Sequence, residues 1–472
     1  MSPRHWHTRA LRFVAAGCAA ILLPWVVSGS IMALSGAVNA ETIEERTFSW
    51  DDGFDRSARK TKIAEGNYER PMLGPDSEQA MLDAIARYQI YVRRGGWTKL
   101  SGGHALVLGS SGKRVEQLTH RLMIAGDLVP PEGFDPTRYD EAVKAAVANF
   151  QERYGLLATG KVDEKTRRAL NVPAADRLRA LEANLPRVRK YAQGLADRYV
   201  VVNIPSAELE AVEGGYLYSR HNTVVGKLDR PTPEVSSDII QVNFNPYWHA
   251  PISIAEKDII PQLRKGLSYL KKINMRVFKG SYYGEEVDPK EVDWSKASPK
   301  TYFFRQEPGA SNAMASVRIN FPNDHEVYLH DTPGKGLFAR AVRYDSSGCV
   351  RVDDVGTFVS WLLKGQDDWS SEKVQDLSNT RERLDVKLGQ QVPLRIVYLT
   401  AWATSDGAVH FRSDIYDRED PDQAARQTVD EVPPEVAAVD TPEPQPELEE
   451  KPDEQQASQG ARQPVKPFSE VR

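Results

Sequence analysis

The chain has 472 residues, more than one ordinary domain needs and enough to bury two or three hydrophobic cores. Its formal net charge is -5, and no stripe of lysines and arginines interleaved with aromatic residues occurs, so nucleic acid is not an expected partner. Length and charge therefore exclude a small binding peptide and a nucleic-acid-binding protein, and they indicate no other partner.

The first forty residues have the pattern of an export signal. Three arginines occur before residue 13, the stretch 13–39 is uncharged, and Ala40 precedes an acidic run. A basic start, an apolar middle and a small residue at the cleavage point are typical of a secretory signal, so we expect residues 1–40 to direct the chain to the periplasm. The apolar run is also long enough to span a bilayer. An uncleaved inner-membrane anchor is therefore the alternative, and no other membrane contact is expected.

The chain has two cysteines, Cys18 within the export signal and Cys349 far along the sequence. The mature protein would keep one thiol and form no internal disulfide. In an oxidising compartment a single thiol has two ordinary explanations, a reactive group or a buried apolar filler. Counting alone does not decide between them.

Helical periodicity marks the first third of the chain. Apolar residues recur at helical spacing over Glu78–Arg94, and residues 109–172 contain three shorter helical stripes. Asp163 has the position of an N-cap for the third of these, because its carboxylate can accept the free N–H groups of the first turn. We expect an N-terminal scaffold over 41–107, a three-helix bundle over 108–172 and a helical connector over 173–198.

Three motifs in the predicted bundle have a family pattern. They are Leu108-Gly109 followed by Val115-x-x-Leu118, the run Ala146-Val147-x-x-Phe150-Gln151-x-x-x-Gly155-Leu156, and Thr159-Gly160-Lys161-Val162-Asp163 leading to Thr166 and Leu170. The bundle thereby resembles the peptidoglycan-binding domain of bacterial wall enzymes. Generic helix packing would use the same apolar residues, so glycan binding by this copy stays open.

From Tyr199 onward the pattern changes to the alternation of β-strands, with Glu213-Gly214-Gly215 as a hairpin turn. The expected strands are Tyr199–Ile204, Glu208–Val212, Tyr216–Val225, Ile239–Phe244, Val317–Phe321, Val327–His330, Leu394–Thr400 and Val409–Phe411. Residues 253–305 form a mixed insertion with a helix near Glu256–Leu263, and insertions of this length are commonly lids or specificity loops. The region 199–416 is thus one mainly-β domain. The acidic, Pro- and Gln-rich tail 417–472 is expected to be disordered.

The residues that can carry chemistry lie in this domain. His330 ends a strand pattern in which Tyr328 and His330 share one face, and the run Ser346-Ser347-Gly348-Cys349-Val350-Arg351 follows after fifteen intervening residues. The next apolar stripe, from Val355, predicts a helix closed by Gly365. Cys349 is therefore expected just before a helix N-terminus, where the helix dipole favours thiolate over thiol.

Each of these residue types fits a step of acyl transfer. His330 can take the thiol proton and later return it to a leaving amine. Backbone N–H groups around Gly348 and Cys349 can hold an oxyanion, and Arg351 can bind a substrate carboxylate. Each residue also has an ordinary structural explanation when taken singly. Their combination favours a cysteine nucleophile.

His330, fifteen intervening residues and Ser-Ser-Gly-Cys-Val-Arg resemble the signature of the L,D-transpeptidase catalytic domain, also called YkuD-type. Further motifs resemble the large periplasmic, YcbB-type subgroup over roughly residues 80–416: Gly95-Gly96-Trp97, Asn184-Leu185-x-Arg187, Asn245-Pro246-Tyr247-Trp248, Arg305-Gln306-x-Pro308-Gly309 through Asn312-Ala313, Phe321-Pro322-Asn323 and His330-Asp331-Thr332-Pro333. Many family members have Gly where this chain has Asp331. The fold class expected is a multidomain α+β protein whose mainly-β L,D-transpeptidase domain carries a capping insertion.

The resemblance implies that Cys349 attacks a meso-diaminopimelate carbonyl in a tetrapeptide stem of peptidoglycan, releases D-Ala and holds a thioester. A second stem would resolve the thioester and leave a 3-3 cross-link. Water would make the enzyme an L,D-carboxypeptidase, and an amine of an outer-membrane protein would make it an anchoring enzyme. The insertion would cap the substrate cleft, and carbapenems are expected to acylate Cys349.

The implied roles cover nine residues. Cys349 is the nucleophile and His330 the general acid and base, while the Asp331 carbonyl orients His330 and the amides of Gly348 and Cys349 hold the oxyanion. The expected substrate contacts are Arg351, Ser346, Ser347, Tyr328 and Trp248. No metal or other cofactor is expected.

Two other classes of protein compete with this interpretation. A zinc metallopeptidase would need ligands such as His249, His325 or His410, but no His-Glu-x-x-His or paired-cysteine spacing is present. A non-catalytic wall-binding protein would need a decayed enzyme domain. The intact His330 and Cys349 argue against decay.

Overall fold

The computed structural model describes residues 62–63, 69–366 and 368–419. The predicted export signal and all but the first three residues of the predicted tail lie outside them. Every described residue belongs to one compact unit, which spans Gly53–Arg472.

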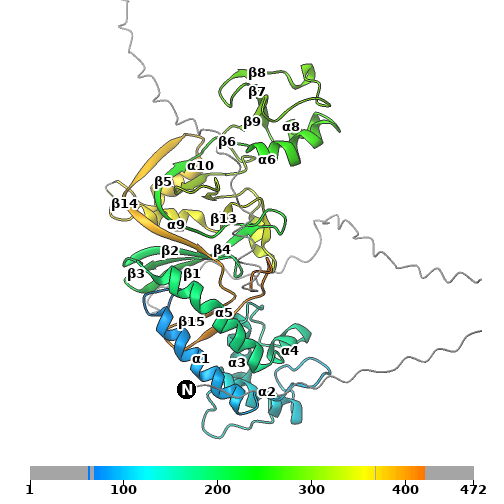
Figure 1. Cartoon of the computed structure of the whole chain (residues 1–472), viewed down its shortest axis with the longest axis vertical. Coiled ribbons are helices and arrows are strands. Elements are labelled where there is room, and N and C mark those ends of the chain that lie inside the picture. Colours follow the sequence, from blue (N-terminus) through cyan, green and yellow to red (C-terminus); the bar gives the residue numbers. More distant parts are fainter. Residues whose placement is uncertain (1–61, 64–68, 367, 420–472) are drawn as a thin grey trace, which may run out of the picture. The chain divides into compact units, whose positions relative to one another are not determined.

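Five helices form the first third of the described chain (Figure 1): α1 Ser77–Arg93, α2 Lys113–Ala125, α3 Glu141–Arg153, α4 Glu164–Leu170 and α5 Ala174–Ala192. The helix predicted over Glu78–Arg94 and the three predicted within 109–172 are present. The carboxylate of Asp163 accepts the Thr166 N–H at 2.8 Å, as expected of an N-cap.

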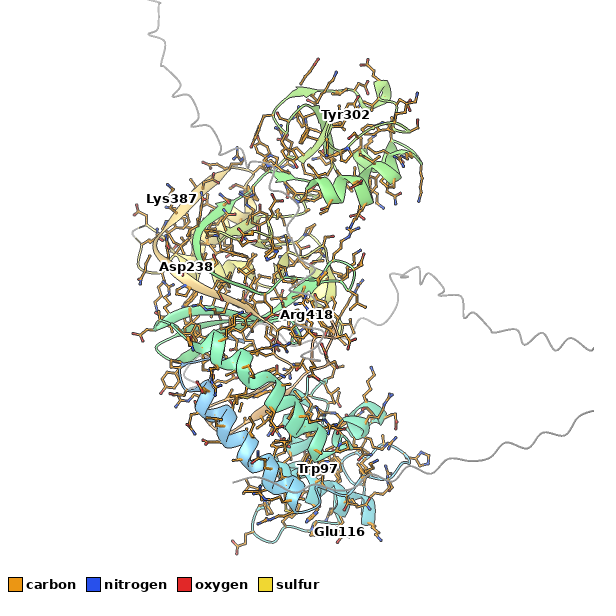
Figure 2. All side chains as sticks on the ribbon, viewed as in Figure 1. Trp97, Glu116, Asp238, Tyr302, Lys387 and Arg418 are labelled. Carbon is orange, nitrogen blue, oxygen red and sulfur yellow. The ribbon has the colours of Figure 1, made fainter. Side chains whose placement is uncertain are left out.

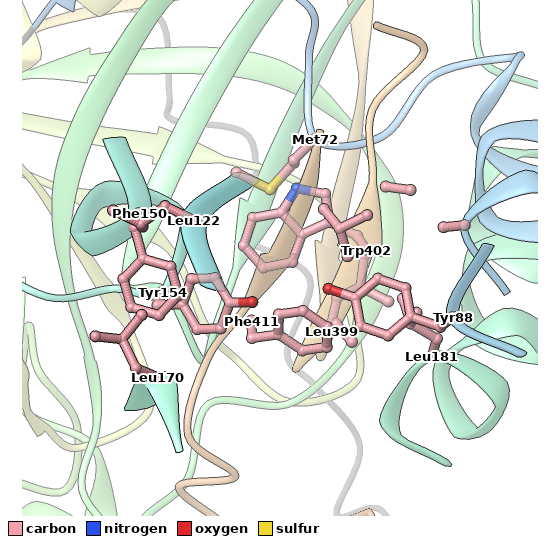
Figure 3. Packing of buried hydrophobic residues seen from close by; sticks show 14 of the residues in the cluster. Met72, Tyr88, Leu122, Phe150, Tyr154, Leu170, Leu181, Leu399, Trp402 and Phe411 are labelled. Atoms are coloured by element: carbon pink, nitrogen blue, oxygen red, sulfur yellow. The ribbon is translucent and has the colours of Figure 1, made fainter. Parts of the chain in front are cut away.

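A short C-terminal hairpin completes the core of these helices. Strands β15 Ala401–Ala403 and β16 Val409–Phe411 pair with each other. The ring of Phe411 lies 6.0 Å from Tyr88 of α1 and 5.3 Å from Tyr154, which follows α3 (Figure 3). The strand predicted over Val409–Phe411 is therefore correct, although it packs into the helical core.

The large sheet contains ten strands: β1 Lys62–Ile63, β2 Arg198–Asn203, β3 Glu208–Glu213, β4 Tyr216–Gly226, β5 Val235–Phe244, β10 Val317–Asn320, β11 Leu329–His330, β12 Tyr344–Ser346, β13 Val350–Val352 and β14 Leu384–Val397. Its order is β1-β4-β13-β11-β10-β5-β14-β2-β3, with β12 beside β4. Because β3 also pairs with β4, the sheet closes on itself.

Two helices follow β13 and pack against this sheet: α9 Val355–Leu362 and α10 Ser371–Asn379. Phe358, Val359 and Trp361 of α9 are fully buried in one core with the inward-facing residues of the sheet. The helix predicted after Val355 is thus present. A 3-10 turn, η3 Lys335–Ala339, connects β11 to β12.

The insertion between β5 and β10 has a hydrophobic core of its own, centred on residues such as Ile259, Trp294 and Phe304. Tyr302, labelled in Figure 2, begins β9 and contacts Trp294 at 5.7 Å. The insertion's elements are β6 Trp248–His249, α6 Ile252–Ile254, the π-helix η1 Ala255–Ile259, α7 Ile260–Leu263, α8 Ser268–Lys272, β7 Met275–Lys279, β8 Glu285–Glu286, the 3-10 turn η2 Pro289–Glu291 and β9 Tyr302–Gln306.

Three parts of the strand prediction need correction. The strand expected over Leu394–Thr400 begins at Leu384 and ends at Val397. The strand expected over Val327–His330 is limited to Leu329–His330, because the Asn323 side chain accepts the Val327 N–H at 3.1 Å and donates to its carbonyl at 3.0 Å. The strands β12 and β13 were not predicted, since three residues show too little alternation to be noticed. The predicted domain boundaries stay predictions.

Candidate active site

The register of two short parallel strands brings the predicted residues to one face of the sheet. Leu329 pairs with Val350 and His330 with Arg351, while the Val350 N–H donates to the Tyr328 carbonyl at 3.0 Å. Leu329 and Val350 point into the core. Because side chains alternate along a strand, the residues on either side of this pair face the other way. We call the surface formed by Tyr328, His330, Cys349 and Arg351 the Cys349 face.

His330 is buried and held in one tautomer. Its Nδ1 lies 2.5 Å from the carbonyl oxygen of Asp331. A carbonyl only accepts, so Nδ1 carries the hydrogen and Nε2 keeps a lone pair. Burial, followed by the charge of Arg351, lowers the pKa of His330 to about 4. At neutral pH the side chain is therefore an uncharged base.

The Asp331 carboxylate fixes the peptide that orients His330. It accepts the Ser316 hydroxyl at 2.7 Å and the Thr332 N–H at 2.7 Å, and it forms an ion pair with Lys335. A glycine at this position would lack all three contacts. The carboxylate thus supports the peptide whose carbonyl holds the imidazole.

The thiol of Cys349 is partly exposed and free, but it does not directly precede a helix. Strand β13 follows it and α9 begins only at Val355, so the expected placement at a helix N-terminus is wrong. Burial raises the pKa of the Cys349 thiol, against the smaller lowering effects of a Tyr328 backbone hydrogen bond, Arg351 and Arg318. The expected preference for thiolate is therefore wrong too, and the thiol needs a base.

The residues Ser346–Cys349 form a tight turn, here called the cysteine turn. The Ser346 hydroxyl donates to the Cys349 carbonyl at 2.5 Å and accepts the Gly348 N–H at 3.2 Å. Gly348 has a φ of 113°, which a side chain would strain. Of the two amides predicted to hold an oxyanion, that of Gly348 is engaged by Ser346. The Cys349 amide has no acceptor among the described residues.

A threonine distant in sequence anchors the same turn. The Thr232 hydroxyl donates to the Gly348 carbonyl at 2.8 Å and accepts the Gly226 N–H at 2.8 Å. Sequence reasoning missed Thr232, because it lies in a Pro-rich connection with no motif. Its two hydrogen bonds set the position of the cysteine turn relative to β4.

The cysteine turn is also tied to the insertion. Arg230 donates through Nη1 to the Ser347 hydroxyl at 3.1 Å and through Nη2 to Asp258 of η1 at 2.9 Å. Ser347, predicted as a substrate contact, thus has a partner within the protein. Arg230 and Asp258 were also missed, since nothing in their local sequence distinguishes them from a surface ion pair.

The remaining predicted contacts lie on or beside the Cys349 face. Arg351 is half-buried, and it makes no hydrogen bond or ion pair within the part of the chain that the structure describes. The guanidinium of Arg318 lies 4.9 Å above the ring of Tyr328. Trp248 pairs with Gln306 and packs against the core of the insertion, so its predicted contact with substrate stays a prediction.

Two searches of the described residues gave negative results. No group of three or more His, Cys, Asp or Glu side chains among them is arranged to hold a metal ion. No helix in the described ranges combines the length and the apolar character needed to cross a membrane.

Comparison with known proteins identifies two domains. Residues 197–375 match the family model of the L,D-transpeptidase catalytic domain, and residues 111–170 match the model described as "Putative peptidoglycan binding domain". A "Putative L,D-transpeptidase" of Haemophilus influenzae is 31% identical over 217 residues, which are 46% of this chain and 44% of that protein. The chain thus matches less than half the length of this relative.

Solved structures of low identity also align. An L,D-transpeptidase from Xylanimonas cellulosilytica is 16% identical, covers 63% of this chain and 98% of its own, and has a TM-score of 0.20. An L,D-transpeptidase from Mycobacterium smegmatis is 11% identical, with coverages of 43% and 58% and a TM-score of 0.21. At these TM-scores the alignments carry no argument.

The fold is thus an α+β arrangement of a helical region with a peptidoglycan-binding domain, followed by a mainly-β domain built around the Cys349 face. Residues 197–375 of that second domain match the L,D-transpeptidase catalytic domain, and the chain is similar over part of its length to an L,D-transpeptidase relative. Assignment to the YcbB-type subgroup stays a prediction.

Proposed function

We propose that this protein is a peptidoglycan L,D-transpeptidase that forms 3-3 cross-links between meso-diaminopimelate residues through a Cys349 thioester. The observation that carries the proposal is the strand register that puts His330 and Cys349 on one face, where the Asp331 carbonyl holds Nδ1 of His330 and leaves the Nε2 lone pair free. This pair has the protonation states that general-base activation of a thiol requires.

In the first half-reaction, His330 Nε2 takes the proton from Cys349 Sγ as the sulfur attacks the diaminopimelate carbonyl carbon. The oxyanion that forms would accept the Cys349 N–H. The C–N bond to D-Ala then breaks, and His330 returns the proton to the leaving amine. The products are a thioester and free D-Ala.

In the second half-reaction, an acceptor amine attacks the thioester carbonyl and loses a proton to His330. The C–S bond breaks, the new amide forms, and the thiolate regains the proton from His330. The amine of a second stem would give the 3-3 cross-link. Water in its place would give an L,D-carboxypeptidase, and an amine of an outer-membrane protein would give an anchoring enzyme.

The peptidoglycan-binding domain at residues 111–170 supports a location at the cell wall. We infer a periplasmic enzyme whose partners are tetrapeptide stems, with contact to the membrane only through the predicted N-terminal signal. A wall-binding protein without activity is the least favoured function, because the His330 and Cys349 pair is complete.

The test is product analysis by mass spectrometry after incubation with disaccharide-tetrapeptide. Wild-type protein should yield a cross-linked dimer and free D-Ala, and Cys349→Ala should yield neither. A tripeptide product alone would identify the carboxypeptidase instead. If neither protein changes the stems, while both bind sacculi, the enzymatic proposal fails. Carbapenem should add its mass to wild-type protein only.

A further inference from the structure

Arg318 projects beside the Cys349 face without an acidic partner. It lies on β10 opposite His330, and its Nε donates to the Asn243 side chain at 3.2 Å. No carboxylate in the described residues forms an ion pair with it. Its charge acts on the Cys349 thiol, as does that of Arg351. Neither arginine has an ion-pair partner among the described residues, although Asp345 acts on the charge of Arg351.

A second uncompensated arginine lies at the start of β14. The Arg383 guanidinium stands 4.3 Å above the ring of Tyr247, which immediately precedes β6, and within the described chain it forms no ion pair. Its neighbour Arg305 also lies over Tyr247, at 4.7 Å, but donates to Glu307 at 2.9 Å. Arg305 is thus neutralised where Arg383 is not.

His249 of the insertion is a residue on which the charges of Arg318, Arg305 and Arg383 all act. Burial first, and then Arg318, Arg305 and Arg383 in turn, lower its pKa to about 4, although Glu307 acts in the opposite direction. Its Nε2 is buried without a hydrogen-bond partner among the described residues. A buried polar atom normally has a partner, because leaving it unpaired costs about 1–3 kcal/mol. The unpaired nitrogen therefore points to a group that the protein itself does not supply.

The aromatic residues around His249 connect it to the Cys349 face. Tyr282 lies 4.7 Å from the His249 ring and donates its hydroxyl to the Ala250 carbonyl at 2.8 Å. Burial, and then the charges of Glu326 and Tyr328, raise the pKa of Tyr282 to about 12. The backbone register relates the two arginines, because Asn243 of β5 pairs with Arg318 on one side and with Asp385, two residues after Arg383, on the other. The Tyr247 ring, which lies under Arg383, is 6.2 Å from the His249 ring.

We propose that His249, Arg318 and Arg383 form a carboxylate-binding subsite for the donor stem peptide, with Arg318 as the residue nearest to Cys349. This inference rests on the proposed function, which supplies a donor with free carboxylates on both sides of its scissile bond. Guanidinium groups bind carboxylates by paired, charge-assisted hydrogen bonds, and a neutral imidazole can add one N–H. A bound carboxylate would compensate both arginines and give Nε2 a partner.

The test measures equilibrium binding of disaccharide-tetrapeptide to Cys349→Ala protein, so that no turnover is needed. Adding Arg318→Gln or Arg383→Gln should weaken binding about 10- to 100-fold, the range of a lost hydrogen bond to a charged group. Arg381→Gln is the matched control, because Arg381 is exposed like Arg383 and lies two residues from it, but has no contact with Tyr247 among the described residues. Its binding should equal that of the parent.

Donors with one carboxylate converted to an amide identify the bound group. If the D-Ala carboxylate occupies the subsite, amidating it should abolish the difference between parent and Arg318→Gln, and amidating diaminopimelate should not. The reverse pattern would assign the diaminopimelate carboxylate. If all donors distinguish the proteins equally, or none does, the subsite is refuted.

Two controls test whether the variants fold. Arg318→Lys keeps the charge and should retain most of the binding, and the melting temperatures of the variants should equal that of the parent protein. The two proposals can fail separately. Wild-type protein that forms no product while its inactive variant shows the expected binding pattern would refute the proposed function and support the subsite. Full activity with equal KM in wild type and Arg318→Gln would support the proposed function and refute the subsite.

Discussion

Two groups of arginines in this protein have opposite surroundings. Around a cavity of about 800 Å³ that residues of the helical bundle, β3, β4 and the C-terminal hairpin line together, three of the five lining arginines are paired with acids, while Arg70 lies over the Tyr216 ring and Arg87 donates to the Gly407 carbonyl. Arg220 donates to Glu210 at 2.7 Å, Arg412 lies 3.5 Å from Glu208, and Arg153 pairs with Asp127. Around the Cys349 face, the three arginines Arg318, Arg351 and Arg383 form no ion pair with any described residue.

This difference in pairing indicates which arginines stabilise the fold and which are available for function. A buried arginine beside a buried carboxylate leaves both groups satisfied, and removing one partner strands the other. An arginine without a carboxylate partner does not stabilise the fold through an ion pair. Around the Cys349 face it leaves a cation with which a bound carboxylate could pair. Substitutions in the first group should therefore change stability, and substitutions around the Cys349 face should change catalysis or binding.

The largest effect should come from the base on the Cys349 face. His330→Gln should lower kcat/KM for the tetrapeptide about 10²- to 10⁴-fold, the usual contribution of a positioned general base. The measurement is steady-state release of D-Ala, with melting temperature as the control for folding. A variant that keeps more than a tenth of wild-type activity would remove His330 from the mechanism.

Among the paired arginines, Arg220→Met should reduce the free energy of unfolding by about 3–5 kcal/mol, because Glu210 would remain buried and charged without its partner. Glu210 is fully buried, and its other hydrogen bond is from the Met72 N–H at 2.7 Å. Chemical denaturation measures the loss. KM for the donor should not change. A raised KM with unchanged stability would mean that Arg220 serves substrate binding and not the stability of the fold.

The double substitution Arg220→Met with Glu210→Gln is the matched control. It removes the stranded charge as well as the cation, so it should recover part of the lost stability. Equal instability of the single and double variants would mean that lost packing, and not the buried charge, causes the effect.

An intermediate effect is expected at the cysteine turn. Thr232→Val removes the hydroxyl that joins Gly348 to Gly226, and it should cost about 1–3 kcal/mol, divided between stability and kcat. Thr232→Ser keeps the hydroxyl and should restore most of the activity. If Val and Ser variants have the same kcat, the hydrogen bond does not position the nucleophile.

Much of the fold could be predicted because its signals are local. The helical stripes, the Asp163 cap and the longer strands each lie within a dozen residues, where periodicity is visible. The strand β13 could not be recognised, since Val350–Val352 is too short to show alternation and leads directly into a helix. That omission produced the wrong placement of Cys349 before a helix N-terminus.

The residues of the site could likewise be predicted only where their signal is local. His330 and Cys349 were found because their spacing forms a family motif, whereas Thr232, Arg318 and His249 come from separate strands and connections. Their relation exists only once β4, β10 and the insertion are assembled. No local pattern reports which arginines will lack a carboxylate, so the uncompensated charges could not be predicted from the sequence.

The smallest effect concerns two histidines of similar pKa. His221 is fully buried, its Nδ1 lies 2.9 Å from the Asp353 carbonyl and its Nε2 2.9 Å from the Ser219 hydroxyl, and burial lowers its pKa to about 4. Both of its nitrogens are satisfied, whereas Nε2 of His249 has no partner among the described residues. Between about pH 4 and the unfolded value near 6.5, the unfolded chain binds a proton that native His221 does not, so stability falls as pH decreases.

His221→Gln should remove this contribution. Between pH 6.5 and 5.5, wild-type protein should lose about 1 kcal/mol more unfolding free energy than the variant. Denaturation curves at the two pH values measure the difference. Donor stem should leave that difference unchanged, since no ligand reaches a satisfied imidazole, whereas the pKa of His249, followed by NMR in Cys349→Ala protein, should rise when donor binds. If donor moves both histidines equally, or neither, an unpaired buried nitrogen does not mark the binding region.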